Sequence, residues 1–386
     1  MPNRAPKEER IISRLMPDAG RALLTGTGKD FIKRVGDEII RDAVYGVLCG
    51  ENLRMQTEFM TRSRLSQLSA SLIALYVRGK LEVPGFGEGL AQLAARQLRV
   101  AKKADAAETW PAQWFIGLTG KAAQNVLKGD EAELVKYVDR YTETLDATVL
   151  HAEETFGRSQ CRFGFENGKT KSDVVEMSWR DLLQLATAIG SQTLTIRGSE
   201  KSMYGKLFER LILGSVLSIL GFRRVEKPAV DREGVFWLSD GSGSREADAT
   251  LLYKPGHLVR FDIGFIGPGN PEISKDKLSR FSAEHNILGK RTYTKTIIVV
   301  DRLPKTAKTE LAAAGIGAGI VQMGMAYWPR NLAVELSKIT SVAYSIQRMG
   351  DDRIREHLRA NLEKIALTEF LGGVNLEATD EGDQPA

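Results

Sequence analysis

Hydrophobic residues in the first half of the chain recur three or four positions apart, which is the spacing of one face of an α-helix. Glycine-rich or proline-containing breaks, such as the one at 79–87, separate these segments. Strand-like alternation is scarce here, and no repeat of fixed period is present. The pattern predicts an all-helical region over 1–190, with helices over 37–50, 62–79, 87–103, 111–129, 130–156 and 176–190.

The pattern changes near position 165, and after residue 190 helical segments alternate with short runs rich in β-branched and aromatic residues. Extended segments are predicted over 191–198, 235–240, 247–253, 257–267, 292–301 and 320–328. Helices are predicted over 202–222, 273–289, 308–319, 331–349 and 353–373. Helices interleaved with strands in this order predict a mixed α/β domain.

These patterns suggest a division of the chain. A helical N-terminal domain occupies 1–190, and an α/β domain occupies 191–345. We expect the helical residues of 346–374 to pack on the core of the α/β domain. The last stretch, 375–386, is acidic and has few apolar residues to bury, so we expect a disordered tail.

The composition is that of an ordinary soluble protein, with 42% hydrophobic and 27% charged residues. A net charge of +5 leans mildly toward a polyanionic partner, although a slightly basic enzyme fits equally well. The cysteines, Cys49 and Cys161, match no zinc spacing and indicate a reducing compartment. Neither a signal-peptide core nor a long apolar run is present, so we expect a cytoplasmic protein with no membrane partner.

Two neighbouring strand segments each carry an acid among apolar residues, Asp248 in ADATLLY and Asp262 in HLVRFDIGFIG. The residues KPGH between them favour a tight turn, so we expect a hairpin that brings the two carboxylates within about 5 Å. Carboxylates that close repel each other unless a cation lies between them. Magnesium prefers such ligands, although two strand-end aspartates that cap turns are an alternative explanation.

The helix predicted over 202–222 is apolar around nearly its whole circumference, which is typical of a buried helix. Glu209 interrupts this apolar surface, with Lys206 and Arg210 beside it. The glutamate is either part of a thin solvated stripe that forms an ion pair or a residue of a functional site.

Glu209 on a helix, Asp248 on a strand and Asp262 on the next strand follow the order of acids in the PD-(D/E)XK nuclease core. Over about 200–300, the segments YGKLFERLILGSVLSILGF, READATLLY and FDIGFIGPGNPEISKDKLSRF resemble type II restriction endonucleases of the CfrBI-type group. The resemblance implies an α/β fold whose PD-(D/E)XK core is a mixed central sheet flanked by helices, here beside an all-α N-terminal region. It does not cover the N-terminal half.

The resemblance also implies roles for these residues. Asp248 matches the first motif aspartate and Asp262 the (D/E) position, so both would be catalytic and bind Mg²⁺. Glu209 matches the helix glutamate that supports the metal site, as a further catalytic residue and ligand. Glu246 alternates onto the same strand face as Asp248, so it is either a further ligand or an alternative to Asp248.

One position departs from the motif, because Gly264 stands where a lysine normally positions the attacking water. A lysine lost outright would indicate an inactive relative. Lys275 and Lys277 are the nearest downstream replacements, and we take Lys277 as the catalytic one. Lys254 lies at the hairpin turn, too far from the acids.

The glycine-rich turn before 273–289 leads into a segment that carries Lys275, Lys277 and Arg280. Cations near the start of a helix suit DNA phosphates, and these side chains are candidates for phosphate or guanine contacts. An ordinary charged surface helix is the alternative.

The resemblance implies a magnesium-dependent type II restriction endonuclease that hydrolyses double-stranded DNA at a short specific site and leaves 5′-phosphate ends. It also implies a homodimer and a companion DNA methyltransferase, with the helical N-terminal half contributing DNA contacts, dimerisation or both. Two alternatives remain open at this point: a structure-specific repair or recombination nuclease, and a non-catalytic sequence-specific DNA-binding protein, which the missing lysine favours.

Overall fold

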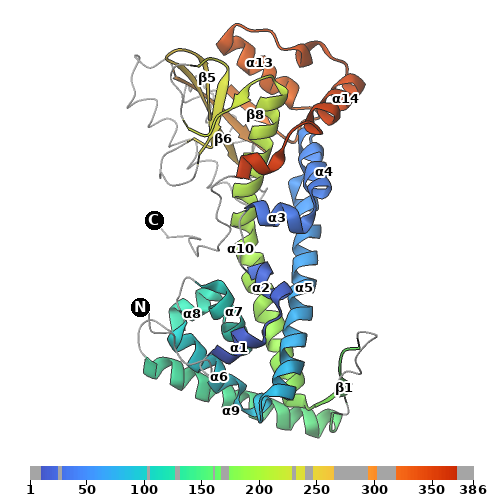
Figure 1. The fold of residues 1–386 in the computed structure, drawn as a ribbon, viewed down its shortest axis with the longest axis vertical. Coiled ribbons are helices and arrows are strands. Elements are labelled where there is room, and N and C mark those ends of the chain that lie inside the picture. Colours follow the sequence, from blue (N-terminus) through green and yellow to red (C-terminus); the bar gives the residue numbers. More distant parts are fainter. Residues whose placement is uncertain are drawn as a thin grey trace. The chain divides into compact units, whose positions relative to one another are not determined.

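The computed structural model describes residues 10–24, 28–101, 105–126, 131–159, 161–166, 174–227, 232–239, 247–264, 294–301 and 319–371. The chain forms two compact units (Figure 1). The first unit comprises Met1–Gly26, Phe59–Ser202 and Leu376–Ala386, and the second comprises Thr27–Glu58 and Met203–Asn375. Two long helices, α5 (Leu53–Glu82) and α10 (Trp179–Ile219), each belong partly to one unit and partly to the other.

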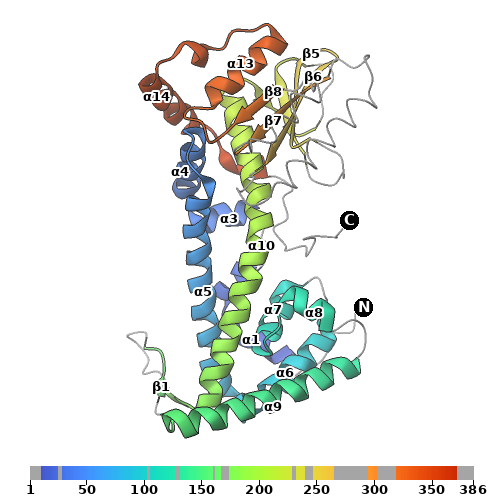
Figure 2. The same cartoon turned by 180° about the vertical axis from the view of Figure 1, so that it is seen from behind.

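The first unit is a group of helices around a continuous apolar core. Tyr76 and Phe86 pack edge to face with ring centroids 5.4 Å apart, and both side chains are buried. Figure 2 shows α6, α7 and α8 beside the long α9. The helical prediction for the N-terminal region is confirmed. The elements of this unit, besides α5 and α10, are α1 (Ile11–Leu15), α2 (Asp18–Leu24), α6 (Phe86–Val100), α7 (Ala106–Phe115), α8 (Gly120–Val126), α9 (Glu131–Phe156), β1 (Cys161–Phe163) and β2 (Val175–Met177).

The prediction of an extended segment over 191–198 was wrong, because these residues lie inside α10. Thr193 and Thr195 make the segment look strand-like in sequence. In the helix, their hydroxyls donate to the carbonyls of Ile189 and Ser191, each at 2.8 Å. Ile196 is fully buried in the core when the segment is helical. This burial outweighs the local preference for a strand.

The helix predicted over 111–129 is interrupted. Gly117 has a positive φ of 74°, which ends α7, and α8 begins at Gly120. Three short helices near the N-terminus were not predicted, nor was the antiparallel pairing of β1 with β2. These elements are short, so their sequences carry few periods of any pattern.

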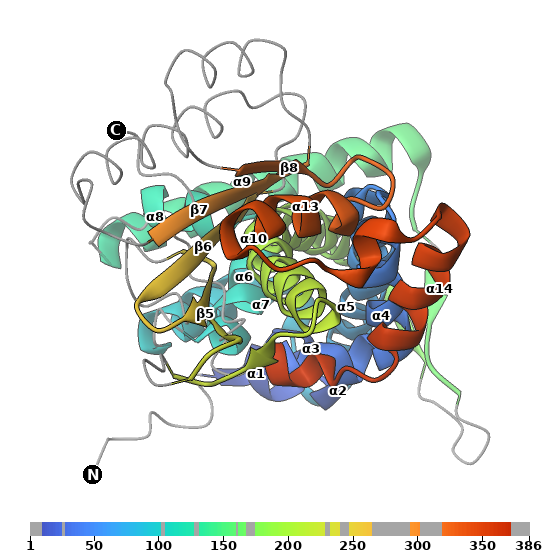
Figure 3. The same cartoon turned by 90° about the horizontal axis from the view of Figure 1, so that it is seen from above.

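The second unit contains a sheet with the strand order β3-β4-β5-β6-β7-β8 among its described residues. Strand β5 pairs antiparallel with both β4 and β6, whereas β7 and β8 continue parallel to β6. Figure 3 shows β5 to β8 following one another beside the end of α10, with α13 near β8. The predicted mixed sheet with flanking helices is confirmed. The strands are β3 (Arg223–Arg224), β4 (Val235–Leu238), β5 (Ala249–Lys254), β6 (His257–Gly264), β7 (Thr294–Val300) and β8 (Gly319–Gln322).

The second half of α10 is buried on nearly every side, as its all-round apolar pattern predicted. Leu207, Phe208, Leu211 and Ile212 are all fully buried. A Cβ atom at Gly214 would lie 2.6 Å from the ring of Phe370, so glycine lets η4 pack directly on α10. The other elements of this unit are α3 (Gly28–Val35), α4 (Asp37–Leu48), α13 (Pro329–Thr340), η3 (Ser345–Arg348), α14 (Asp351–Leu362) and η4 (Leu367–Leu371).

Several segments predicted in this unit extend past the ends of the observed elements. The strand predicted over 320–328 ends at Gln322, where the N–H of Gly324 turns back to the carbonyl of Asp301 at 3.0 Å. The helix predicted over 331–349 ends at Ser341, which adopts a positive φ of 59°. The helix predicted over 273–289 and the tail at 375–386 lie outside the described residues. So does the helix predicted over 308–319, except for Gly319, which begins β8. No helix in the described ranges is long and apolar enough to cross a membrane.

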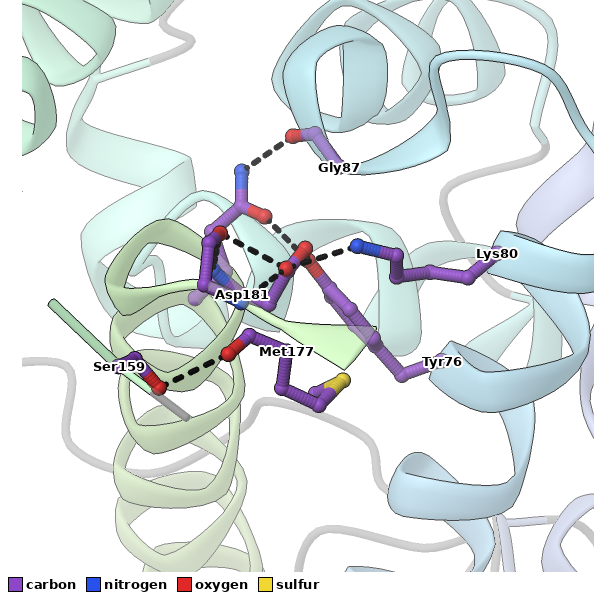
Figure 4. Close-up of polar contacts among 8 residues, drawn as sticks. Tyr76, Lys80, Gly87, Ser159, Met177 and Asp181 are labelled. Atoms are coloured by element: carbon purple, nitrogen blue, oxygen red, sulfur yellow. Dashed lines mark hydrogen bonds and ion pairs between the residues drawn. The ribbon is translucent and has the colours of Figure 1, made fainter. Parts of the chain in front are cut away.

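A buried polar cluster joins α5, α6 and α10 within the first unit (Figure 4). Asp181 is 2% exposed, and its Oδ2 accepts from the Ser178 N–H at 2.7 Å and from Lys80 Nζ at 2.8 Å. The Tyr76 hydroxyl donates to Oδ1 at 2.7 Å. Burial by itself raises the pKa of Asp181, but the hydrogen bonds from Lys80, Ser178 and Tyr76 outweigh it and lower this pKa.

We expect Asp181→Asn to lower the free energy of unfolding by about 3 kcal/mol, because it leaves Lys80 without its buried carboxylate. Urea-induced unfolding of the full chain measures this change. Asp146→Asn is the matched control, since Asp146 pairs with Arg180 at a side chain that is 51% exposed. The control should change stability by less than about 1 kcal/mol. Equal losses in the two variants would contradict a special role for the buried cluster.

The same variant has a defined pH dependence. A carboxyl group whose pKa is lowered in the folded state stabilises fully above its unfolded pKa, which is about 3.9 for aspartate. This contribution is lost as the pH falls from that value toward the folded pKa. The stability difference between the wild type and Asp181→Asn should therefore be constant near neutral pH and shrink below a pH of about 4.

Candidate functional site

The two strand aspartates come from a tight β-hairpin. Pro255 and Gly256 form its turn, and Gly256 has the positive φ of 74° that the third position of a type II turn requires. The register pairs Ala249 with Phe261, so continuing by one residue places Asp248 opposite Asp262. The hairpin predicted from KPGH is confirmed. Directly opposed residues in an antiparallel pair have Cα atoms about 4.5–5.5 Å apart.

The Asp248 side chain is held by the neighbouring strand. Its Oδ2 accepts the backbone N–H of Ile263 at 2.8 Å, just beyond the last recorded strand pair. Its own carbonyl accepts the N–H of Ser239 at 3.1 Å, at the end of β4. The carboxylate therefore lies beside the peptide that joins Asp262 to Ile263.

Burial alternates along β6 and separates its two faces. Val259, Phe261 and Ile263 are fully buried, whereas Arg260 and Asp262 are half-buried. Side chains two residues apart on a strand project from the same face. Arg260 and Asp262 therefore share the more open face of an otherwise apolar strand.

Glu209 lies half-buried on α10, directly before Arg210. Arg210 is only 8% exposed, and its guanidinium donates to the carbonyl of Phe370 at 2.7 Å and to the carbonyl of Ser239. Because Ser239 also donates to the Asp248 backbone, Arg210 ties α10 to the strand end that carries Asp248. The sequence pattern did not predict that Arg210 is buried and joins two elements. The one indication was that a charged residue lies inside an apolar helix.

A third acid lies at the end of β7 beside the hairpin. The N–H of Asp301 donates to the carbonyl of Gly264 at 3.3 Å, and the register pairs Gly264 with Val300. Asp301 therefore follows β7 at the same edge of the sheet where β6 ends. Sequence reasoning treated this residue only as the end of a strand.

The carboxylate pair suits a divalent cation by its chemistry. In the described ranges no three His, Cys, Asp or Glu side chains gather closely enough to hold a metal ion. Magnesium, however, commonly takes only one or two carboxylates and completes its shell with waters and substrate phosphates. Asp248 and Asp262 fit this ligand set.

Several predicted residues are not described by the structure. Glu246, Lys275, Lys277 and Arg280 all lie in ranges outside the described residues. Lys254 is exposed at the turn, and the strand between it and Asp248 spans about 20 Å when extended. That distance removes Lys254 as a replacement for the motif lysine.

Comparison with known proteins identifies relatives of this chain. Residues 37–308 match the sequence model of a family described as CfrBI restriction endonuclease. The type II restriction enzyme CfrBI of Citrobacter freundii is 31% identical over 359 residues, which cover 91% of this chain and 96% of the relative. No solved structure matches the chain. The chain therefore belongs to the CfrBI restriction endonuclease family, and it is a type II site-specific deoxyribonuclease.

Proposed function

We propose that this restriction endonuclease is magnesium-dependent, that it leaves 5′-phosphate ends, and that Asp248 and Asp262 form its active site. The observation that carries the proposal is the hairpin register, which continues to Asp248 opposite Asp262, together with the 2.8 Å bond from Ile263 to Asp248. The family relationship favours this function over a repair nuclease or a non-catalytic DNA-binding protein.

We further propose that the second unit is a PD-(D/E)XK nuclease core. The order of its elements supports this assignment, since helix α10 with Glu209 precedes the antiparallel strands β4, β5 and β6. The next described strand, β7, runs parallel to β6. Asp248 precedes β5 and Asp262 lies on β6, which are the positions that the two motif acids would occupy.

Asp248 and Asp262 would hold the metal ion, and Glu209 would support it. Type II restriction endonucleases generally use divalent metal ions, and such an ion, when bound, activates water and stabilises negative charge on the phosphate. Lys277 would take the role of the motif lysine and orient the attacking water. The water oxygen forms a bond to phosphorus, the bond to the 3′ oxygen breaks, and the phosphate stays on the 5′ end.

Lys275, Lys277 and Arg280 are proposed to contact DNA, where they would neutralise phosphate charge. We propose a homodimer, because two active sites would cut both strands and the described residues of each chain supply one opposed pair of aspartates. A companion methyltransferase would protect host DNA at the same site. The helical unit would contribute DNA contacts, dimerisation or both.

Digestion of phage or plasmid DNA tests the activity and its metal dependence. We expect discrete fragments with Mg²⁺ and none after addition of EDTA. The fragment ends should accept a label from polynucleotide kinase only after phosphatase treatment, because they already carry 5′-phosphates. Binding without cleavage, or cleavage of branched DNA alone, would contradict the proposed function.

Asp248→Asn and Asp262→Asn should each slow cleavage about 1000-fold or more, because each removes a charged metal ligand. DNA binding should be retained or tighter, since a negative charge near the phosphate is removed. Cleavage rates and DNA affinities measured on the same preparations check both parts. Asp352→Asn, on the exposed surface of α14 in the same unit, is the matched control and should cut normally. A near wild-type rate in either site variant means that the site lies elsewhere.

Lys277→Met should abolish cleavage if Lys277 replaces the motif lysine. Lys275→Met, two residues away, is the control and should mainly weaken binding, with the slope of log K against log salt falling by about 1. Single-turnover cleavage and binding at several salt concentrations separate the two effects. Full activity of Lys277→Met would shift the catalytic role to Lys275 or to another cation.

A further inference from the structure

A cation shares a strand face with the two proposed active-site acids. Arg260 lies on β6 two residues before Asp262, so both side chains project from the same face. The register pairs Arg260 with Thr250, two steps along the hairpin from the position where Asp248 opposes Asp262. One face of this hairpin therefore carries an arginine, a threonine hydroxyl and two carboxylates.

Arg260 lies on the more open of the two faces of β6. Its strand neighbours Val259 and Phe261 are fully buried, and Arg260 itself is half-buried. Val259 and Phe261 project from the opposite face, so Arg260 shares its own face with Asp262. The two aspartates belong to the same face of the hairpin, and a DNA phosphate bound over them would present its negative oxygens to Arg260.

A fixed cation at this place would speed phosphodiester hydrolysis. Negative charge grows on the non-bridging oxygens of the phosphate as water attacks, and donors already in place stabilise it. A guanidinium fits this task because its planar fork matches two phosphate oxygens and because it stays charged when partly buried. Gly264, on the same strand, has no side chain to offer.

We propose that Arg260 contacts the scissile phosphate and holds it over Asp248 and Asp262. This inference rests on the proposed active site. Arg260 forms no covalent bond and transfers no proton. Its N–H groups donate to the non-bridging oxygens, and these hydrogen bonds strengthen as charge develops. The Cα atoms of Arg260 and Asp262 are about 7 Å apart in a regular strand, a span that an arginine side chain can bridge. This role is separate from that of Lys277 at the attacking water.

The test uses the full-length enzyme and a duplex oligonucleotide that contains a site mapped from its own digestion of phage DNA. Under single-turnover conditions, Arg260→Met should cleave about 100- to 1000-fold more slowly than the wild type. Arg260→Lys should recover part of the rate, because it restores the charge but not the fork. Lys254→Met is the matched control, since it removes one charge from the turn of the same hairpin and should cut normally.

A second measurement separates phosphate contact from a purely structural role in balancing the two aspartates. A phosphorothioate at the scissile position replaces one non-bridging oxygen by sulfur, which accepts hydrogen bonds poorly. If Arg260 contacts that oxygen, one phosphorothioate isomer should slow the wild type more than it slows Arg260→Met. A structural role would lower the melting temperature of Arg260→Met but leave the ratio of oxygen to sulfur rates unchanged.

The outcomes are distinguishable from those that test the active site. An Arg260→Met enzyme within about threefold of the wild-type rate overturns the inference, as does an unchanged phosphorothioate ratio for both isomers. If Asp248→Asn and Asp262→Asn are inactive in the same assay, only the role of Arg260 fails. If those variants cut normally, the proposed active site fails together with it.

Discussion

The hydrogen bond from the Ile263 N–H to the Asp248 carboxylate is the contact on which the candidate site depends. It lies where regular pairing of β5 with β6 stops, after Ala249 and Phe261. At this position the Asp248 carboxylate accepts the N–H of Ile263. A hydrogen bond to a charged group contributes about 1.5–3 kcal/mol, which helps to offset the repulsion between two opposed aspartates.

The hairpin is in turn anchored to the long helix α10, which precedes it in the sequence. Arg210 of α10 donates to the carbonyls of Ser239 and Phe370, and Ser239 donates to the Asp248 backbone. A buried cation that bonds only to one element would gain little from its position. By bridging η4 and the end of β4, Arg210 makes the location of Asp248 depend on the packing of α10.

The face that bears Asp262 also bears Arg260, and this combination suits a substrate that is itself an anion. Two carboxylates alone would repel a DNA phosphate, so the proposed site requires positive charge, which a bound metal ion and the protein would supply. An arginine fixed on the same strand supplies that charge without the conformational freedom of a loop side chain. Gly264 stands where the motif has a lysine, which favoured an inactive relative in the sequence analysis. That argument is weaker here, because Arg260 provides a cation on the same strand.

Local signals predicted a large part of this architecture. The KPGH turn predicted the hairpin because a proline and a glycine specify their own backbone angles, and the all-round apolar pattern of 202–222 predicted a buried helix. Local signals failed at 191–198, where two threonines suggested a strand but burial of Ile196 in the core requires a helix. Whether the segment forms a helix or a strand depends on the residues that pack against it. Those residues lie elsewhere in the chain, so the local sequence does not show them.

The sequence by itself determined that two acids belong to one hairpin, and the turn between them predicted that they come close. Only the tertiary structure decided how they are held. The acceptor of the Ile263 N–H, the anchoring of Ser239 by Arg210 and the approach of Asp301 to Gly264 all join residues from different elements. Such contacts depend on strand register and on helix packing, which are set by the whole core. Periodicity and turn chemistry describe only the nearest neighbours along the chain.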